Sequence, residues 1–94
     1  MIIGTCIYDI HLYSSQSLKD KRRVLKSVIE RVKNKFNVSI AEVDRQDNWQ
    51  HAVVGIAVVS NNTVHVNQVL NNVTNFIENA GEEMEITRVT MEII

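Results

Sequence analysis

The fold is decided by residues 38–60, which read VSIAEVDRQDNWQHAVVGIAVVS. Both ends of this stretch, from Val38 to about Arg45 and from His51 to Ser60, have the β-branched, apolar composition of strands. The turn at residues 46–49 is too short for a crossover, so the two strands must pair antiparallel. The second strand is apolar on both faces, which predicts a central place in its sheet.

Before this hairpin, the pattern predicts a strand and then a helix. Residues 2–13 are rich in Ile and Tyr and read as the strand, and the helix is expected from Leu18 to about Phe36 after a polar break. Ser17 and Asp20 have the spacing of a capping box, with Asp in place of the usual Glu or Gln. The helix presents an apolar stripe of Leu18, Leu25, Ile29, Val32 and Phe36, with Lys21, Arg22 and Val28 along its edges.

After the hairpin, the same two elements follow in the other order. Asn61 and Asn62 offer an N-cap for a second helix, and Gly81 is expected to end that helix in the left-handed conformation. Residues 84–94 return to a β-branched pattern and predict the last strand. Right-handed crossovers then favour an α+β fold, the ferredoxin-like βαββαβ sandwich with sheet order 4-1-3-2 and both helices on one face. The 94 residues are expected to form one domain, 1–94.

The second face of such a sheet is not covered by its own helices. Ile7 is expected on it, together with either Val53, Ala57 and Val59 or Val54, Ile56 and Val58. Aliphatic surface of this extent favours burial, so we expect a homodimer formed through sheet faces or edges. The alternative is that strand twist and long neighbouring side chains shield an ordinary surface.

Charge is distributed very unevenly along the chain, although the formal net charge is −1. Residues 17–36 hold eight basic and two acidic side chains, a net +6, and the remainder holds two basic and nine acidic, a net −7. Like charges at i,i+4 and cations in the first turn both oppose helix stability, so local stability does not select this pattern. An anionic partner such as RNA would relieve it, and an ordinary solvated helix surface is the alternative. The candidate anion-binding residues are Lys19, Lys21, Arg22, Arg23 and Lys26.

No motif for a cofactor, a metal ion or a covalent intermediate is present. The three glycines are isolated from one another, which excludes a phosphate-binding glycine loop, and the three histidines lack metal-ligand spacing. Cys6 is the single cysteine and is expected to be a small buried hydrophobe rather than a reactive thiol. There is no signal-peptide pattern and no apolar run of about 20 residues, so we expect a cytoplasmic protein without a membrane partner.

Polar residues on the strands leave a catalytic site open as an interpretation. Asp9 and His11 project from one strand to one face, and Glu42 and Asp44 from another. With Arg88 they are compatible with a cluster on the open sheet face, either for acid–base chemistry or only to satisfy polar groups. The same fold hosts RNA-recognition modules that stack bases on strand aromatics, but residues 51–57 carry no ring of that kind and Tyr8 is a lone candidate, so we expect any RNA contact to use the basic helix and phosphates instead.

Two segments resemble the YlxP-like bacterial family of unknown function. They are SLKDKR at residues 17–22, and AEVDRQDNWQ at 41–50 leading into VVGIAVVSN at 53–61, within a similarity that runs nearly end to end. The resemblance implies a ferredoxin-like fold and a small cytoplasmic protein. Such proteins are often encoded beside translation and ribosome-maturation factors, which implies an RNA-linked role by association. The shared motif positions are Lys19, Lys21, Arg22, Glu42, Asp44, Asp47 and Trp49.

The leading hypothesis is therefore a small binding protein that contacts RNA or a ribosome-associated particle through the basic first helix. The alternative is a protein-interaction or small-ligand-binding domain that uses the open sheet face. Trp49 in the turn either covers the hairpin or contacts a partner. Whether the protein is also an enzyme stays open. The candidate interaction site of the alternative consists of Glu42, Asp44, Asp47 and Trp49.

Overall fold

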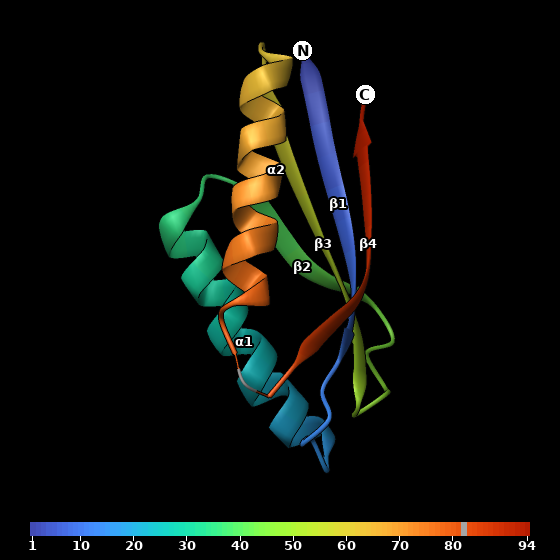
Figure 1. Ribbon diagram of the computed structural model, residues 1–94. Helices are drawn as coiled ribbons and strands as arrows, with labels where there is room; N and C mark the ends of the chain where they lie inside the picture. Colours follow the sequence, from blue (N-terminus) through green and yellow to red (C-terminus); the bar gives the residue numbers. More distant parts are fainter. Residues whose placement is uncertain (82) are drawn as a thin grey trace.

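The computed structural model describes residues 1–81 and 83–94. Its elements are β1 (Ile2–His11), α1 (Leu18–Lys35), β2 (Ser39–Asp44), β3 (His51–Ser60), α2 (Thr63–Glu78) and β4 (Glu85–Ile93). The strands form one antiparallel sheet in the order β2-β3-β1-β4, and both helices cover the same face (Figure 1). The predicted βαββαβ order is confirmed, and the predicted 4-1-3-2 order is the same sheet read from the opposite edge.

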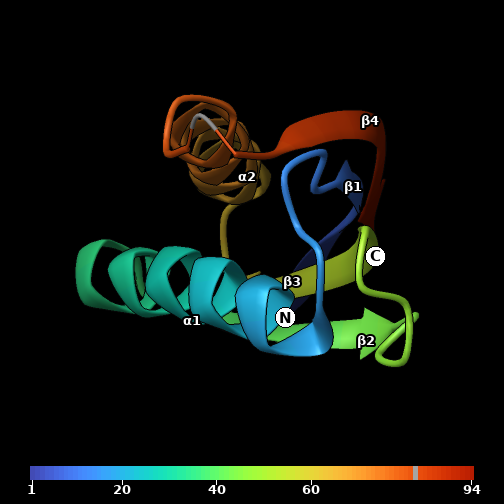
Figure 2. The ribbon, with the colours of Figure 1, turned by 90° about the horizontal axis from the view of Figure 1, so that it is seen from below.

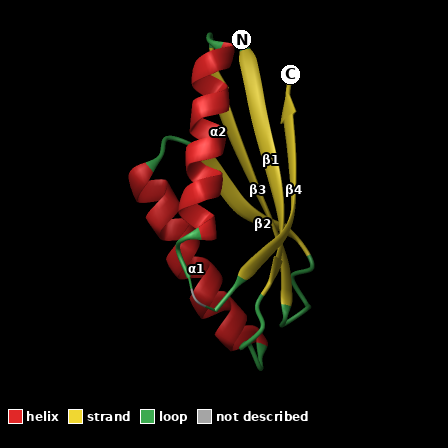
Figure 3. Cartoon of the chain, viewed as in Figure 1, coloured by secondary structure: helices red, strands yellow, loops and turns green. Residues whose placement is uncertain are grey.

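The two central strands of the sheet are β1 and β3 (Figure 3), and they hold most of its buried side chains. Successive side chains of a strand point to opposite faces, so Cys6, Tyr8 and Ile10 face the helices and are buried. Residues 3, 5, 7 and 9 point to the open face, where their β3 partners are residues 59, 57, 55 and 53. Of the two sets of open-face residues considered, the one with Val53, Ala57 and Val59 is therefore correct.

Helix α1 begins where its capping residues predict. The Ser17 hydroxyl accepts a hydrogen bond from the Asp20 backbone N–H at 3.1 Å, while the Asp20 carboxylate accepts from the Gln16 N–H at 3.1 Å. The buried face differs from the predicted stripe. At about 100° per residue its centre is Lys21, which was expected at the edge. Its other buried members are Val24, Leu25, Val28 and Val32.

Helix α2 is capped at its start by Asn62, whose side-chain oxygen accepts from the N–H groups of Val64 and His65. It ends at Glu78 with Asn79 as C-cap, and none of the three glycines, all of which are described, has a positive φ. The expected left-handed stop at Gly81 is therefore wrong, since the helix has already ended before it. Gly4 of β1 has a different role, which is to let α2 pack closely against the sheet. A Cβ at this position would collide with the Val66 side chain of α2.

Two further side chains of β1 lie in the core between the sheet and the helices. Cys6 is fully buried, as expected for a small hydrophobe. Tyr8 is also fully buried, and its hydroxyl lies 2.7 Å from the Thr74 hydroxyl of α2. Burial raises the pKa of Tyr8. Tyr8 is therefore not available to stack on a base.

Among the described residues, no helix is both long and apolar enough to cross a membrane.

Candidate functional site

The outer face of α1, defined here as Lys19, Arg22, Arg23 and Lys26, points away from the sheet and is exposed to solvent. Arg23 has a long ion pair with Glu83, with 3.6 Å between guanidinium and carboxylate, and both side chains are largely solvated. Over residues 1–81 and 83–94, the other three cations of this face have no ion pair, although Glu30 lies on the same flank about one turn beyond Lys26. The outer face is thus a cationic surface with little neutralisation of its own.

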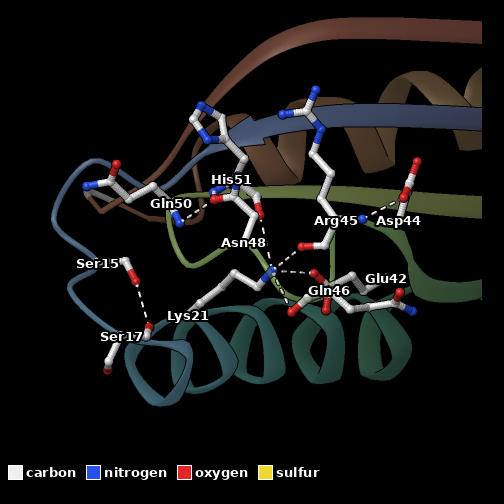
Figure 4. A network of polar contacts seen from close by, with 10 residues as sticks. All are labelled: Ser15, Ser17, Lys21, Glu42, Asp44, Arg45, Gln46, Asn48, Gln50 and His51. Atoms are coloured by element: carbon white, nitrogen blue, oxygen red, sulfur yellow. Dashed lines mark hydrogen bonds and ion pairs between the residues drawn. The ribbon is translucent and has the colours of Figure 1, made fainter.

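Lys21 does not belong to that surface, which corrects its place among the anion-binding candidates. Its side chain is fully buried, and its ammonium lies 2.8 Å from the Glu42 carboxylate of β2. The same ammonium donates to the backbone carbonyls of Arg45 at 2.8 Å and His51 at 3.1 Å, with a longer contact of 3.4 Å to Gln46 (Figure 4). A buried charge is tolerated only when it is paired and hydrogen-bonded, and here all three N–H donors of Lys21 have acceptors.

These contacts form the Lys21 network, which ties α1 to both ends of the β2–β3 loop. Arg45 has φ 58°, in the left-handed region that a residue with a Cβ rarely adopts. Its carbonyl accepts from Lys21 and also from the Asn48 N–H at 3.0 Å. The Asn48 side chain in turn accepts from the N–H groups of Gln50 and His51 at 2.9 and 3.1 Å. Together these hydrogen bonds satisfy three carbonyls and three N–H groups of the loop and its ends, which restrains the loop backbone.

The loop side chains of the candidate interaction site separate into two groups. Asp44, Asp47 and Trp49 line one open hollow of about 560 Å³, together with Arg45, Gln46 and Asn48. Trp49 is 44% exposed and so contributes a half-solvated aromatic wall. Glu42 is not part of this group, because it points to the helix side of the sheet and pairs with Lys21. The predicted set is therefore divided between the two faces of the hairpin.

On the open face, a cluster of polar residues lies at the end of the sheet near the β2–β3 loop, and the sequence predicted only some of its members. Asp9 and Arg88 are cross-strand partners, and both line a hollow of about 320 Å³ with Arg45 and His51. The rings of His51 and His11 stack with 5.0 Å between their centroids. Asp9, His11 and Arg88 do share this region as expected, but Glu42 does not. No group of three or more His, Cys, Asp or Glu suited to a metal ion occurs in residues 1–81 and 83–94.

Arg45 and His51 were missed as members of this region because their strands had no assigned register. The register at that end contains an irregularity, since Asp44 pairs with Val53 although Glu42 pairs with Val54. This bulge at Val43 rotates the following residues toward the open face. The only sequence signal for the place of Arg45 was that a charged residue directly follows a strand and precedes a short polar turn.

Comparison with known proteins places the chain in a family. A family model described as a protein of unknown function, DUF503, matches residues 3–91. The uncharacterized protein YlxP of Bacillus subtilis (strain 168) is 46% identical over 88 residues, which are 93% of this chain and 96% of that protein. The resemblance noted from the sequence is thereby confirmed.

Two solved structures are similar in fold, and both are designed proteins. The de novo designed protein Foldit4 has a TM-score of 0.56 at 18% identity, over 100% of this chain and 97% of that one. The de novo designed protein LFR1 1 with ferredoxin fold has a TM-score of 0.55 at 13% identity, over 100% of this chain and 83% of that one. At these identities the similarity shows the ferredoxin-like fold and carries no function.

Proposed function

The chain belongs to the DUF503 family of YlxP-like bacterial proteins, and we propose that it is a binding protein that contacts RNA through the outer face of α1. The observation that carries this proposal is the state of Lys19, Arg22 and Lys26, which are exposed and have no ion pair among the described residues. They stand on a helix of net charge +6 in a chain whose remainder has −7. Mutual repulsion on such a surface is relieved by a polyanion rather than by the protein itself.

The chemistry of the outer face favours a phosphate chain over a lipid surface. None of the large exposed hydrophobic side chains belongs to α1. A helix that lies on a membrane needs apolar side chains to insert beside its cations, whereas contacts to nucleic-acid phosphates need only the cations. Tyr8 offers no surface for base stacking, since it faces the core. We therefore expect binding that depends on salt far more than on sequence.

The test is fluorescence anisotropy with a labelled RNA hairpin, and sedimentation with small ribosomal subunits, across a series of salt concentrations. Three to four contacts predict a slope of log K against log salt of about −2 to −4. The variant Arg22→Gln with Lys26→Gln removes two contacts and should make the slope shallower by about 1.4–1.8. Its melting temperature should be that of the unmodified protein.

The matched control is Gln68→Glu with Asn71→Glu on the exposed side of α2, which lowers the net charge by the same two units. If α1 is the contact surface, the control binds much more tightly than the α1 variant. Equal losses in the two variants would mean that only total charge matters, and the absence of any binding at low salt would end the proposal.

A second candidate function rests on the hollow beside Trp49. Its Trp49 wall is half exposed, and it is lined by the carboxylates of Asp44 and Asp47 together with Arg45, a net charge of −1 that suits a cationic peptide or small molecule. Trp49 is the only tryptophan, so its emission reports on this hollow directly. A spectral shift with a lysine- and arginine-rich peptide, combined with no response to RNA in the anisotropy experiment, would favour this function over the first.

We also propose that the protein works as a homodimer. The open sheet face retains exposed aliphatic side chains, with Ile7 at 42%, Val43 at 53% and Val59 at 61% exposure. These side chains come from three different strands, and the polar side chains of Thr5 and Asp9 flank Ile7 on β1. Exposed aliphatic surface on a small domain favours self-association, and the contact between two copies uses either this face or an edge of the sheet.

A further inference from the structure

The two edges of the sheet differ in how well they are protected from pairing with another strand. The β2 edge is six residues long and carries a bulge before Asp44, which is followed by the left-handed Arg45. Short length, bulges and charges are the usual devices that block edge pairing. The β4 edge is nine residues long. Its pairing with β1 has a register shift near the N-terminal end of β4 and is regular from Arg88 to Ile93. It contains neither Pro nor Lys.

Hydrogen bonds between β4 and β1 show which backbone groups of β4 point outward. Ile94 and Ile3 exchange both of their hydrogen bonds, at 2.8 and 3.0 Å. In an antiparallel ladder such pairs alternate with pairs that have no hydrogen bond between them. Residues 92, 90 and 88 therefore bond toward β1, and the N–H and C=O groups of Val89, Met91 and Ile93 point away from the sheet. A partner strand must bond to those three residues.

We propose that a second copy of this chain pairs antiparallel with β4 along this edge, about a two-fold axis at Thr90. In this register Val89 bonds to Met91 of the other copy, and the two Thr90 side chains meet at the axis. Arg88 then lies directly opposite Glu92 of the other copy, and the symmetry forms that contact twice. These are pairs without mutual hydrogen bonds, in which side chains are closest and opposite charges stabilise the sheet.

Other symmetric registers do not have this complementarity. With the axis at Arg88 or at Glu92, like charges face each other across the interface, which is unfavourable. With the axis at Val89 or Met91, the charged residues face Thr90 or an aliphatic residue. Only the axis at Thr90 satisfies both charges and also uses the outward backbone groups. On the helix side it brings together Val89 and Met91, each 39% exposed in one chain.

The resulting dimer has one continuous eight-stranded sheet with all four helices on the same face. Helix α1 lies beside β2, at the edge opposite to β4 (Figure 2). Pairing through β4 therefore leaves the outer faces of both α1 helices free at the two ends of the assembly. The interface rests on the proposed homodimer and not on the proposed RNA contact, so its test requires no RNA.

The test is sedimentation equilibrium of the full chain over micromolar concentrations, with charge-swap variants. Arg88→Glu alone and Glu92→Arg alone each turn two attractive contacts into two repulsive ones, so each should weaken the dimer roughly tenfold or more. Mixing these two variants should restore dimers, because every contact then joins opposite charges. The double variant R88E/E92R should restore them as well.

Two further variants distinguish this edge from the open sheet face. Met91→Pro removes an outward N–H that β1 does not use, so it should abolish dimers while far-UV circular dichroism stays native. Val59→Glu places a charge on the open face and should leave dimerisation unchanged. A chain that is monomeric throughout the concentration range, or a dimer that Val59→Glu disrupts and Glu92→Arg does not, would overturn the proposal.

Discussion

The inner and outer faces of α1 use the same residue type for opposite purposes. Lys21 is fully buried, and its ammonium has a carboxylate and backbone carbonyls as partners. Lys26, five residues later, is exposed and has no ion pair among the described residues. The first lysine contributes to holding the β2–β3 loop, and the second contributes only positive potential. In a basic run, the position relative to the sheet decides what each cation does.

The largest effect expected from this comparison follows replacement of the two lysines by alanine. Lys21→Ala leaves Glu42, whose side chain is 19% exposed, without its cation and removes the donor to the loop carbonyls, so it should cost about 3–5 kcal/mol of unfolding free energy. Lys26→Ala removes only solvated groups and should stay within about 0.5 kcal/mol. Urea unfolding followed by circular dichroism measures both. Equal losses of unfolding free energy in the two variants would show that Lys21 and Lys26 contribute equally to stability, contrary to this comparison.

A double variant shows where that cost originates. Lys21→Met keeps the apolar stem, so its damage should come mainly from the unpaired carboxylate and carbonyls. Adding Glu42→Gln removes the buried charge and should recover part of the loss, a coupling of about 1–3 kcal/mol. Additive costs in this cycle would contradict a direct interaction between the two residues.

A smaller effect is expected at the loop that Lys21 holds. The left-handed φ of Arg45 costs about 1–3 kcal/mol for a residue with a Cβ and most for a β-branched one. Arg45→Gly should therefore be neutral or slightly stabilising, whereas Arg45→Val should destabilise by about 1–2 kcal/mol relative to it. Differential scanning calorimetry of the two variants tests this, and a valine variant as stable as the glycine variant would argue against a strained loop.

The smallest effect concerns the outer face and has the opposite sign. Lys19→Glu places an anion in the first turn and replaces a repulsive i,i+4 pair with Arg23 by an attractive one. We expect a gain of about 0.3–1 kcal/mol at low salt that decreases as salt is added. The same variant should bind RNA more weakly. A gain in stability together with a loss of binding would separate the two roles of the helix.

Much of the fold could be predicted from the sequence because its signals are local. The hairpin strands, both helix N-caps and the alternation of helices and strands depend on neighbouring residues, and β3 occupies His51–Ser60 as expected. The burial of Lys21 could not be predicted, since its acceptors are carbonyls of residues 24–30 positions later in the chain. The division of Glu42 from Asp44 depended on the bulge at Val43, which leaves no mark in a single sequence.

The hydrogen bonds between Ile3 and Ile94 have a consequence for engineering the chain. They hold the two ends of the chain on neighbouring antiparallel strands, so a short turn from Ile94 to Met1 would convert β4 and β1 into an ordinary hairpin (Figure 1). New ends could then be opened at Asn61, which is exposed between β3 and α2. The sequence of such a circular permutant would begin with α2, and the β2–β3 loop that Lys21 holds by hydrogen bonds would remain intact.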